Sequence, residues 1–297
     1  MTPARGGREG PARARLDERR WHFQHGPIDL VVEACGAEAA AAEACERGWR
    51  RFASVLDELV AELAVLRQPV ERAAGVRGPV ARRMLAACWR HRGRFITPMA
   101  AVAGAVADEV LAAMMAGAGG VSKAYVNNGG DIALHLGAGE TFRIGVVAGP
   151  ERLTRHGHRL PLDGRFEVTA AMPVRGVATS GWRGRSWSLG IADSVSVLAA
   201  DGAAADAAAT MIANAVDVDH PAVERRRACD MADNTDLGER LVTIAVGELP
   251  GDAVEAALER GAAHAGALED AGHIWGAVLA LRSRYRVVGG LAALERG

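Results

Sequence analysis

Two short polar segments hold residue types that could bind a phosphorylated ligand. The first is Asn127-Asn128-Gly129-Gly130-Asp131, which lies between two apolar, strand-like runs. Paired glycines after asparagine favour a tight turn with positive φ, and backbone N–H groups at such a turn can contact an anion such as phosphate. Asp131 would lie where the turn re-enters a sheet. An ordinary hairpin turn explains the same residues without a ligand.

The second segment carries a carboxylate and a hydroxyl four residues apart. Asp206 and Thr210 fall in the alanine-rich stretch 203–215, which its composition predicts to be helical, so the two side chains share one face. Mg²⁺ prefers hard oxygen ligands and commonly takes one carboxylate, waters and substrate phosphates, so this pair could hold it. The alternative is a structural acidic residue near a helix start, where the macrodipole stabilises it.

Other polar residues give weaker signals. Thr179-Ser180-Gly181 follows a strand-like run and could donate hydroxyl hydrogen bonds to a phosphate or to its own turn. It does not match Gly-x-Ser-x-Gly, and no Ser-His-Asp order surrounds it, so a serine nucleophile is not predicted. The pairs His22 with His25 and His156 with His158 supply too few ligands for a closed metal site, and hydrogen-bonded or solvent-exposed rings are the favoured interpretation.

The order of these segments resembles the ApbE-like family, whose characterised members are magnesium-dependent FAD:protein FMN transferases. The resemblance covers residues 102–212. The segments that carry it are, in chain order, Val102-Ala-Gly-Ala-Val-Ala-Asp108, which resembles the family's Ala-Lys-Gly-x-x-x-Asp, then Gly129-Gly130-Asp131-Ile132, Ala178-Thr-Ser-Gly181, the strand-like Ser194-Val-Ser-Val197 and Ala205-Asp206-x-x-x-Thr210.

This resemblance implies roles for the candidate residues. Asp206 and Thr210 would hold Mg²⁺, and Asp206 would be the catalytic residue. The nucleotide, FAD or FMN, would be positioned by two groups of residues, which are Asn128, Gly129, Gly130 and Asp131 at the turn and Thr179, Ser180 and Gly181 on the phosphate side. FMN transfer would further require a protein acceptor that offers a threonine.

The chain also departs from the family pattern. Ala103 stands at the family's lysine position, and Lys123 is the only lysine in the sequence. The family's His-x-x-Asp-Pro-x-x-Gly segment is replaced by Arg183-Gly-Arg-Ser-Trp-Ser-Leu-Gly190. The chain is therefore similar to a divergent branch, the uncharacterised ApbE-like proteins grouped as UPF0280. Two alternatives to a transferase stay open, namely a non-catalytic ligand-binding or assembly protein on the same scaffold and a magnesium-dependent phosphoester hydrolase.

Composition limits the class of partner. The 297 residues carry a formal net charge of −1 with mixed signs, so there is no electrostatic footprint for nucleic acid or an anionic membrane. A phosphorylated small molecule is the expected ligand, and homo-oligomers are left open. The four cysteines form no C-x-x-C pair, which argues against zinc and disulfides and fits a reducing cytoplasm. We expect a cytoplasmic protein with no leader peptide and no membrane span of about 20 apolar residues.

The elements that must position the candidate residues indicate an α+β fold. We expect residues 1–20, rich in Arg, Gly and Pro, to be a disordered tail, and 21–297 to be one ApbE-like domain or two packed halves. Helices are predicted over 37–66, 79–91, 97–115, 203–215 and 253–268, the third with Thr97 as N-cap and Pro98 as first residue. Strands and hairpins between them do not alternate strictly with helices, which favours a mixed or mostly antiparallel sheet with packed helices.

Overall fold

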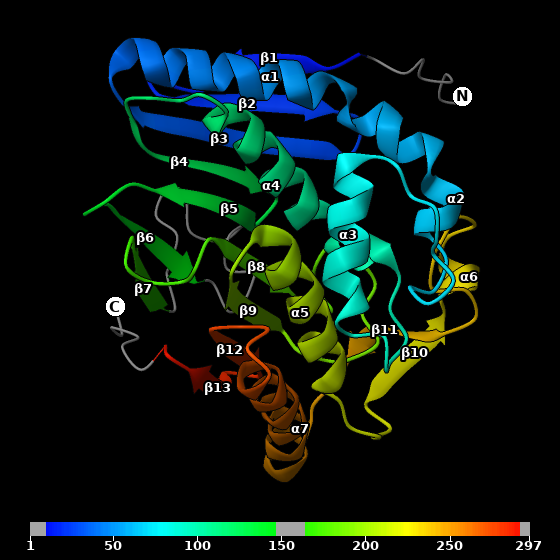
Figure 1. The fold of residues 1–297 in the computed structure, drawn as a ribbon. Coiled ribbons are helices and arrows are strands. Elements are labelled where there is room, and N and C mark those ends of the chain that lie inside the picture. Colours follow the sequence, from blue (N-terminus) through cyan, green and yellow to red (C-terminus); the bar gives the residue numbers. More distant parts are fainter. Residues whose placement is uncertain (1–9, 147–163, 292–297) are drawn as a thin grey trace.

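The computed structural model describes residues 10–146 and 164–291, and combines helices with a large antiparallel sheet (Figure 1). The predicted α+β class is confirmed. His156 and His158 lie outside the described residues.

The central sheet has nine strands in the order β1-β2-β3-β4-β5-β8-β9-β12-β13, and all neighbouring strands pair antiparallel. Strand bounds are Ala12–Arg15 (β1), Arg20–His25 (β2), Ile28–Gly36 (β3), Val121–Asn128 (β4), Asp131–Leu136 (β5), Gly176–Ser180 (β8), Ser194–Ala199 (β9), Gly276–Leu281 (β12) and Arg284–Gly289 (β13). Two small sheets pair β6 (Thr141–Val146) with β7 (Gly164–Thr169) and β10 (Val223–Arg227) with β11 (Leu241–Val246).

Strand β1 corrects one expectation. It lies inside the segment 1–20 that composition predicted to be a disordered tail, and it pairs with β2 from Ala12 opposite Gln24 to Arg15 opposite Trp21. Its four side chains are all exposed, so this strand is held by backbone hydrogen bonds and by arginine contacts such as Arg13 with Glu46, and not by an apolar pattern. Composition alone therefore gave no signal for it.

Helices cover one face of the central sheet (Figure 1). Along the sheet, α1 (Glu38–Ala61) packs on β2 and β3, α4 (Val102–Met115) on β4 and β5, α5 (Gly202–Ala215) on β8 and β9, and α7 (Gly251–Asp270) on β12 and β13. Helix α3 (Pro79–Trp89) lies outside α4 and α5. The short elements are α2 (Leu63–Leu66), the 3₁₀ helix η1 (Pro98–Ala101) and α6 (Ala228–Met231).

The single helix predicted over 37–66 is interrupted at Glu62. This residue leaves helical geometry with φ −109° and ψ 6°. Its carboxylate accepts hydrogen bonds from the N–H groups of Arg77 at 2.5 Å and Gly78 at 2.9 Å, at the start of α3. The break thus provides acceptors for N–H groups that the next helix start would leave unpaired.

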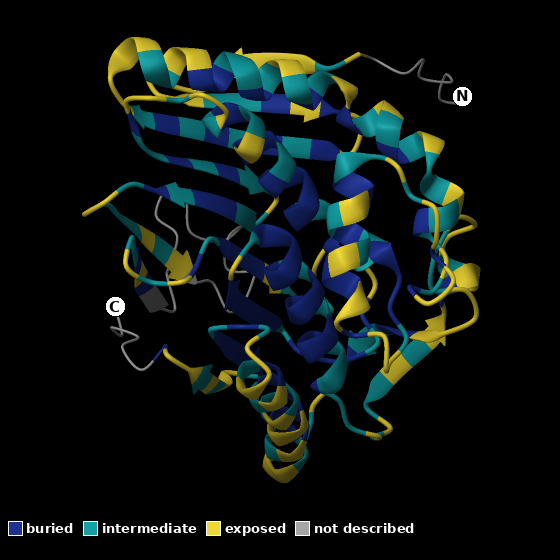
Figure 2. Cartoon of the chain, viewed as in Figure 1, coloured by how far each residue is buried: buried dark blue, intermediate teal, exposed yellow. Residues whose placement is uncertain are grey.

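Buried apolar residues form three clusters, one beneath α1 and α4, one beneath α5 and α7, and one on the opposite face beneath the β6–β7 hairpin. Helices α4 and α5 are buried along most of their length (Figure 2). By length and composition the 18-residue stretch Pro98–Met115 could cross a membrane, but 56% of it is buried within this fold, where it is a core helix.

The start of that stretch differs from the expectation. The stretch begins with one 3₁₀ turn at Pro98, and the α-helix follows it. The side chain of Thr97 makes no capping hydrogen bond. Its hydroxyl instead donates to a carboxylate oxygen of Asp236, which is distant in the sequence.

Candidate functional site

The Asn-Gly-Gly-Asp segment forms the tight turn of the β4–β5 hairpin. Gly129 and Gly130 take positive φ of 66° and 116°, which explains why this turn uses glycine. The N–H of Gly130 donates to Oδ1 of Asn127 at 2.8 Å, so one of the N–H groups expected to face a ligand is satisfied inside the turn. Asn128 donates from Nδ2 to the carbonyl of Ala103 at 3.1 Å, which fastens the turn to the start of α4.

Asp131 begins β5, beside the end of β8. Its Oδ1 accepts the N–H of Thr179 at 3.2 Å, and the hydroxyls of Thr179 and Ser196 lie 2.8 Å apart. Burial raises the pKa of Asp131 to about 7, although the Thr179 N–H acts in the opposite direction. Asp131 itself is half-buried, so its side chain retains partial solvent access.

Strand β8 ends with the other predicted phosphate-side residues. Ser180 pairs with Val195 of β9. Next in the chain, an added Cβ at Gly181 would lie 2.5 Å from the carbonyl oxygen of Asp193, so glycine is needed there for close backbone packing. The structure brings Thr179 to Asp131, whereas the contacts of Gly181 are with the backbone that leads into β9.

Asp206 lies on α5 and contacts the first turn of α4. Its Oδ2 accepts the N–H of Gly104 at 3.0 Å. Burial and the charge of Asp131 raise the pKa of Asp206 well above its usual range, while the N–H groups of Gly104 and Ala103 oppose that rise. Asp131 and Asp206, 75 positions apart in the sequence, are therefore close enough for one carboxylate to affect the other.

A polar stripe runs along α5. Between Gly202 and Asn214 every residue is buried except Asp206, Thr210 and Asn214, which recur every fourth position and so share one face. The hydroxyl of Thr210 makes no hydrogen bond with the part of the chain that the structure describes. No described residue therefore competes with an external ligand for this hydroxyl, and its role as a metal ligand stays a prediction.

Helices α4 and α5 cap each other. Asp108 of α4 accepts the N–H groups of Gly202 and Ala203, both at 2.8 Å, at the start of α5, and Asp206 of α5 accepts from the start of α4. Burial, then Asp201, raises the pKa of Asp108 to about 6. The helices can approach this closely because Gly104 has no side chain, since a Cβ there would lie 2.1 Å from the carbonyl oxygen of Gly202.

Two further groups near Asp206 had no recognisable signal in the sequence. The Cys88 thiol is buried on α3, and burial raises its pKa well above the usual range, with further increases from Asp206 and Asp236. Asp236 comes from the loop after α6 and accepts the Thr97 hydroxyl hydrogen bond. Neither residue lies in a motif, and because they are far apart in the sequence, no local pattern indicates that both lie near Asp206.

The donor set agrees in kind with Mg²⁺. Asp206, Thr210 and Asp131 offer hard carboxylate and hydroxyl oxygens, and the Thr210 hydroxyl has no hydrogen-bond partner among the described residues. Across residues 10–146 and 164–291, no three His, Cys, Asp or Glu side chains are grouped to hold a metal ion. A magnesium ion here would therefore need ligand phosphates and waters to complete its coordination.

Comparison with known proteins identifies the family. A family model described as "AbpE bacteria" matches residues 13–289. The chain belongs to this family. Among its relatives, the UPF0280 protein of Methanosphaerula palustris is 32% identical over 201 residues, which are 66% of this chain and 77% of that protein. UPF0280 protein MK0206 of Methanopyrus kandleri is 37% identical over 153 residues, which are 50% of this chain and 56% of that protein. The prediction of an ApbE-like, UPF0280-type protein is confirmed.

Several solved chains also match. One of them is a point mutant of the flavin transferase ApbE from Vibrio cholerae, with 12% identity, a TM-score of 0.39, and coverage of 94% of this chain and 98% of that chain. A TM-score of 0.39 is too low to transfer residue roles or activity to this ApbE-like protein.

The segment that departs from the ApbE-like pattern, residues 183–190, is attached to the polar stripe. Oδ1 of Asn214 accepts the N–H of Leu189 at 2.9 Å and the Ser188 hydroxyl at 3.2 Å. On the other side Asp193 accepts the indole N–H of Trp182 at 3.2 Å. The replacement segment is thus held at its C-terminal end by Asn214 and just before its N-terminal end by the contact of Trp182 with Asp193. Asn214 lies on the same face of α5 as Asp206.

Proposed function

We propose that this ApbE-like protein binds a flavin nucleotide, or a related phosphorylated ligand, together with Mg²⁺ at Asp131, Asp206 and Thr210. The observation that carries the proposal is the approach of two carboxylates from β5 and α5, beside a hydroxyl with no partner in the described chain. Two neighbouring half-buried carboxylates repel each other when both are charged, and a divalent cation relieves that repulsion. The family resemblance of the segments around all three residues supports flavin as the first candidate.

In the transferase form, FMN would pass from FAD to a threonine of an acceptor protein. The acceptor would lose its hydroxyl proton to solvent, its oxygen would bond to the FMN phosphorus, and AMP would leave as the pyrophosphate linkage breaks. Bound Mg²⁺ would supply positive charge to the pyrophosphate. The chain's own contribution would be positional, because Thr179 and its hydroxyl partner Ser196 hold Asp131, while α4 holds Asp206.

A second candidate is a ligand-binding or assembly protein without catalysis. It is favoured by Ala103 at the family's lysine position and by the structural role of Asp206, which serves as an N-terminal acceptor for α4. A magnesium-dependent phosphoester hydrolase is the remaining alternative. The candidates share the binding step and differ in turnover, so one experiment can test binding first.

The test titrates purified protein with FAD and FMN, with and without MgCl₂, and follows flavin fluorescence. Thr210→Val is the decisive variant, because valine keeps the side-chain shape and removes a hydroxyl that no described residue uses. Asp230→Asn, at an exposed position of α6, is the control. We expect Thr210→Val to weaken magnesium-dependent binding about tenfold at unchanged thermal stability, and the control to bind as wild type.

Absence of magnesium-dependent flavin binding in the wild type would reject flavin as the ligand. Equal affinity of wild type and Thr210→Val would reject the metal assignment. If flavin binds, release of AMP from FAD in the presence of an acceptor threonine separates transfer from binding alone, and release of inorganic phosphate from a panel of phosphoesters identifies the hydrolase.

A further inference from the structure

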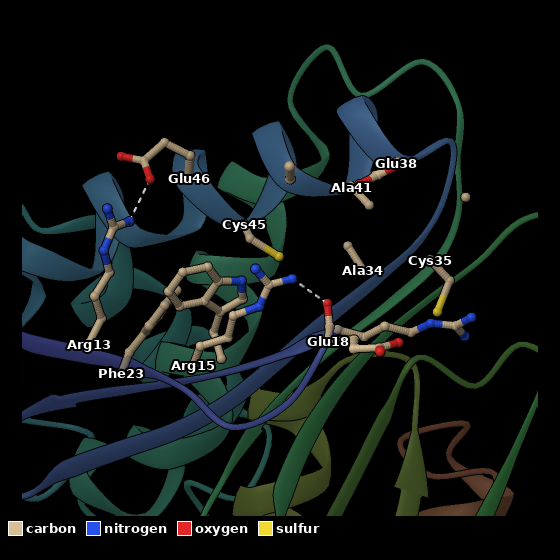
Figure 3. A pocket seen from close by; sticks show the side chains of 14 residues that line it. Arg13, Arg15, Glu18, Phe23, Ala34, Cys35, Glu38, Ala41, Cys45 and Glu46 are labelled. Atoms are coloured by element: carbon tan, nitrogen blue, oxygen red, sulfur yellow. Dashed lines mark hydrogen bonds and ion pairs between the residues drawn. The ribbon is translucent and has the colours of Figure 1, made fainter.

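Two cavities contain clustered arginines, and they differ in how that charge is balanced. The cavity between the N-terminal strands and α1 has a volume of about 610 Å³ (Figure 3). Its three arginines are matched by three glutamates in the lining, and Arg13 pairs with Glu46 at 2.5 Å. Arg15 donates to the carbonyl of Glu18. This first cavity is internally compensated and needs no anionic ligand.

The second cavity, of about 490 Å³, lacks such compensation. It lies between the turn after α2, the turn after α3 and the loop that follows α6. One carboxylate, Glu71, is in its lining, whereas the lining has four arginines, Arg72, Arg92, Arg94 and Arg240. None of these guanidinium groups forms an ion pair with a carboxylate in residues 10–146 or 164–291. The cavity therefore presents a large excess of positive charge.

The walls of the second cavity are held by hydrogen bonds and ring contacts. The N–H of Val70 donates to the carbonyl of Ile96 at 2.8 Å, which joins two of the three turns. The guanidinium of Arg240 lies over the Phe95 ring, 3.1 Å from its centroid. Arg92 donates to the carbonyl of Trp89 at 3.1 Å and lies over its ring at 5.2 Å. Two of the four arginines are thus partly ordered before any ligand binds, which lowers the entropic cost of binding.

The second cavity adjoins the Asp206 region through shared loops. The turn that carries Arg94 and Phe95 continues into Thr97, whose hydroxyl donates to Asp236, and Asp236 lies on the same loop as Arg240. Its lining nevertheless includes none of Asp131, Asp206 and Thr210. The arginine cavity is therefore a separate place for a ligand, beside the candidate site rather than within it.

We propose that this arginine cavity is a binding site for a polyphosphorylated small molecule, with pyrophosphate as its smallest ligand, held by Arg72, Arg92, Arg94 and Arg240 without a divalent cation. Planar guanidinium groups bind phosphate oxygens with paired, charge-assisted hydrogen bonds. Several such groups around one cavity favour a ligand with several adjacent negative charges over a single phosphate. This assignment is independent of the proposed function, since it uses no residue of the magnesium site.

The experiment is calorimetric titration of inorganic pyrophosphate and tripolyphosphate into the full chain in EDTA, with inorganic phosphate as the comparison ligand. The double variant Arg72→Gln/Arg94→Gln removes two exposed cavity arginines. The control, Arg50→Gln/Arg226→Gln, removes the same charge from exposed positions on α1 and β10. Since all four positions are exposed, each variant should fold, and circular dichroism checks this.

We expect saturable pyrophosphate binding that weakens with added salt. The affinity should fall at least about tenfold in the cavity variant and should equal that of the wild type in the control variant. Thr210→Val should leave this binding unchanged. The proposal is overturned by no saturable binding in EDTA, by equal losses of affinity in the cavity and control variants, or by loss of binding in Thr210→Val. The last result would place pyrophosphate at the magnesium site instead, so failure of this inference is distinguishable from failure of the proposed function.

Discussion

Acid should weaken the fold through a histidine cluster at the end of α3. His91 is buried, with 7% of its surface exposed, and its ring centroid lies 6.4 Å from that of His273. Burial, then His264, His273 and Arg90, lowers the pKa of His91 from 6.5 to about 4. In the unfolded chain this ring takes up a proton that the folded protein excludes, so stability is complete above pH 6.5 and is lost as the pH falls towards 4.

The magnitude follows from these two values. Between pH 7 and pH 5, selective protonation of His91 in the unfolded state lowers the free energy of unfolding by about 2 kcal/mol. Burial and Arg94 also lower the pKa of His264, whose Nε2 is buried without a hydrogen-bond partner among the described residues, so this second ring acts in the same direction. The raised pKa values of Asp108 and Asp131 act in the opposite direction. The difference between wild type and a His91 variant is therefore diagnostic.

The assay is urea unfolding at pH 7 and pH 5. His91→Gln should make the loss of stability between the two pH values smaller than in wild type by about 2 kcal/mol. Met84→Leu, a nearly volume-conserving change at a fully buried position of α3, controls for general loosening of that helix and should keep the wild-type pH response. If His91→Gln and wild type lose equal free energy on acidification, the linkage argument is refuted.

Two backbone features give further predictions, both read from urea midpoints at pH 7. Gly104→Ala should lower the free energy of unfolding by about 3 kcal/mol or more, because its Cβ would lie 2.1 Å from the Gly202 carbonyl oxygen. In the control Gly119→Ala the Cβ meets no atom within 4 Å, so stability should hardly change. Similar losses of stability at both sites would contradict the close helix crossing. Asp201→Ala should cost about 1 kcal/mol through loss of the α5 N-cap bond to Ala204, which is 2.7 Å long, and an unchanged midpoint would exclude that contribution.

Local patterns in the sequence predicted the elements around the candidate site well. The alanine-rich stretch 203–215 is α5, which begins one residue earlier at Gly202, and the Asn-Gly-Gly turn joins β4 to β5 as expected. Both predictions rest on short-range physics, since helix propensity and positive φ depend on neighbours in the chain. The strand β1 has no apolar alternation and was missed for that reason.

Contacts between distant segments could not be predicted in the same way. No local pattern indicates that Asp108 binds the N–H groups of α5, that Thr97 donates to Asp236, or that four arginines from three loops surround one cavity. Each depends on how helices and loops pack after the sheet has formed. The family resemblance predicted Asp206 to be a metal ligand, a role that stays a prediction, but it did not predict that this carboxylate supports α4.

This second role of Asp206 decides how the site must be tested. One of its oxygens, Oδ2, accepts an N–H at the start of α4, so removal of the carboxylate leaves a buried donor unpaired and costs stability whether or not a metal binds. A loss of ligand binding in an Asp206 variant could therefore come from a displaced helix. Thr210, one turn further along the same face, makes no hydrogen bond within the described chain. Its substitution separates ligand binding from folding, because Thr210→Val removes a hydroxyl that no described residue uses.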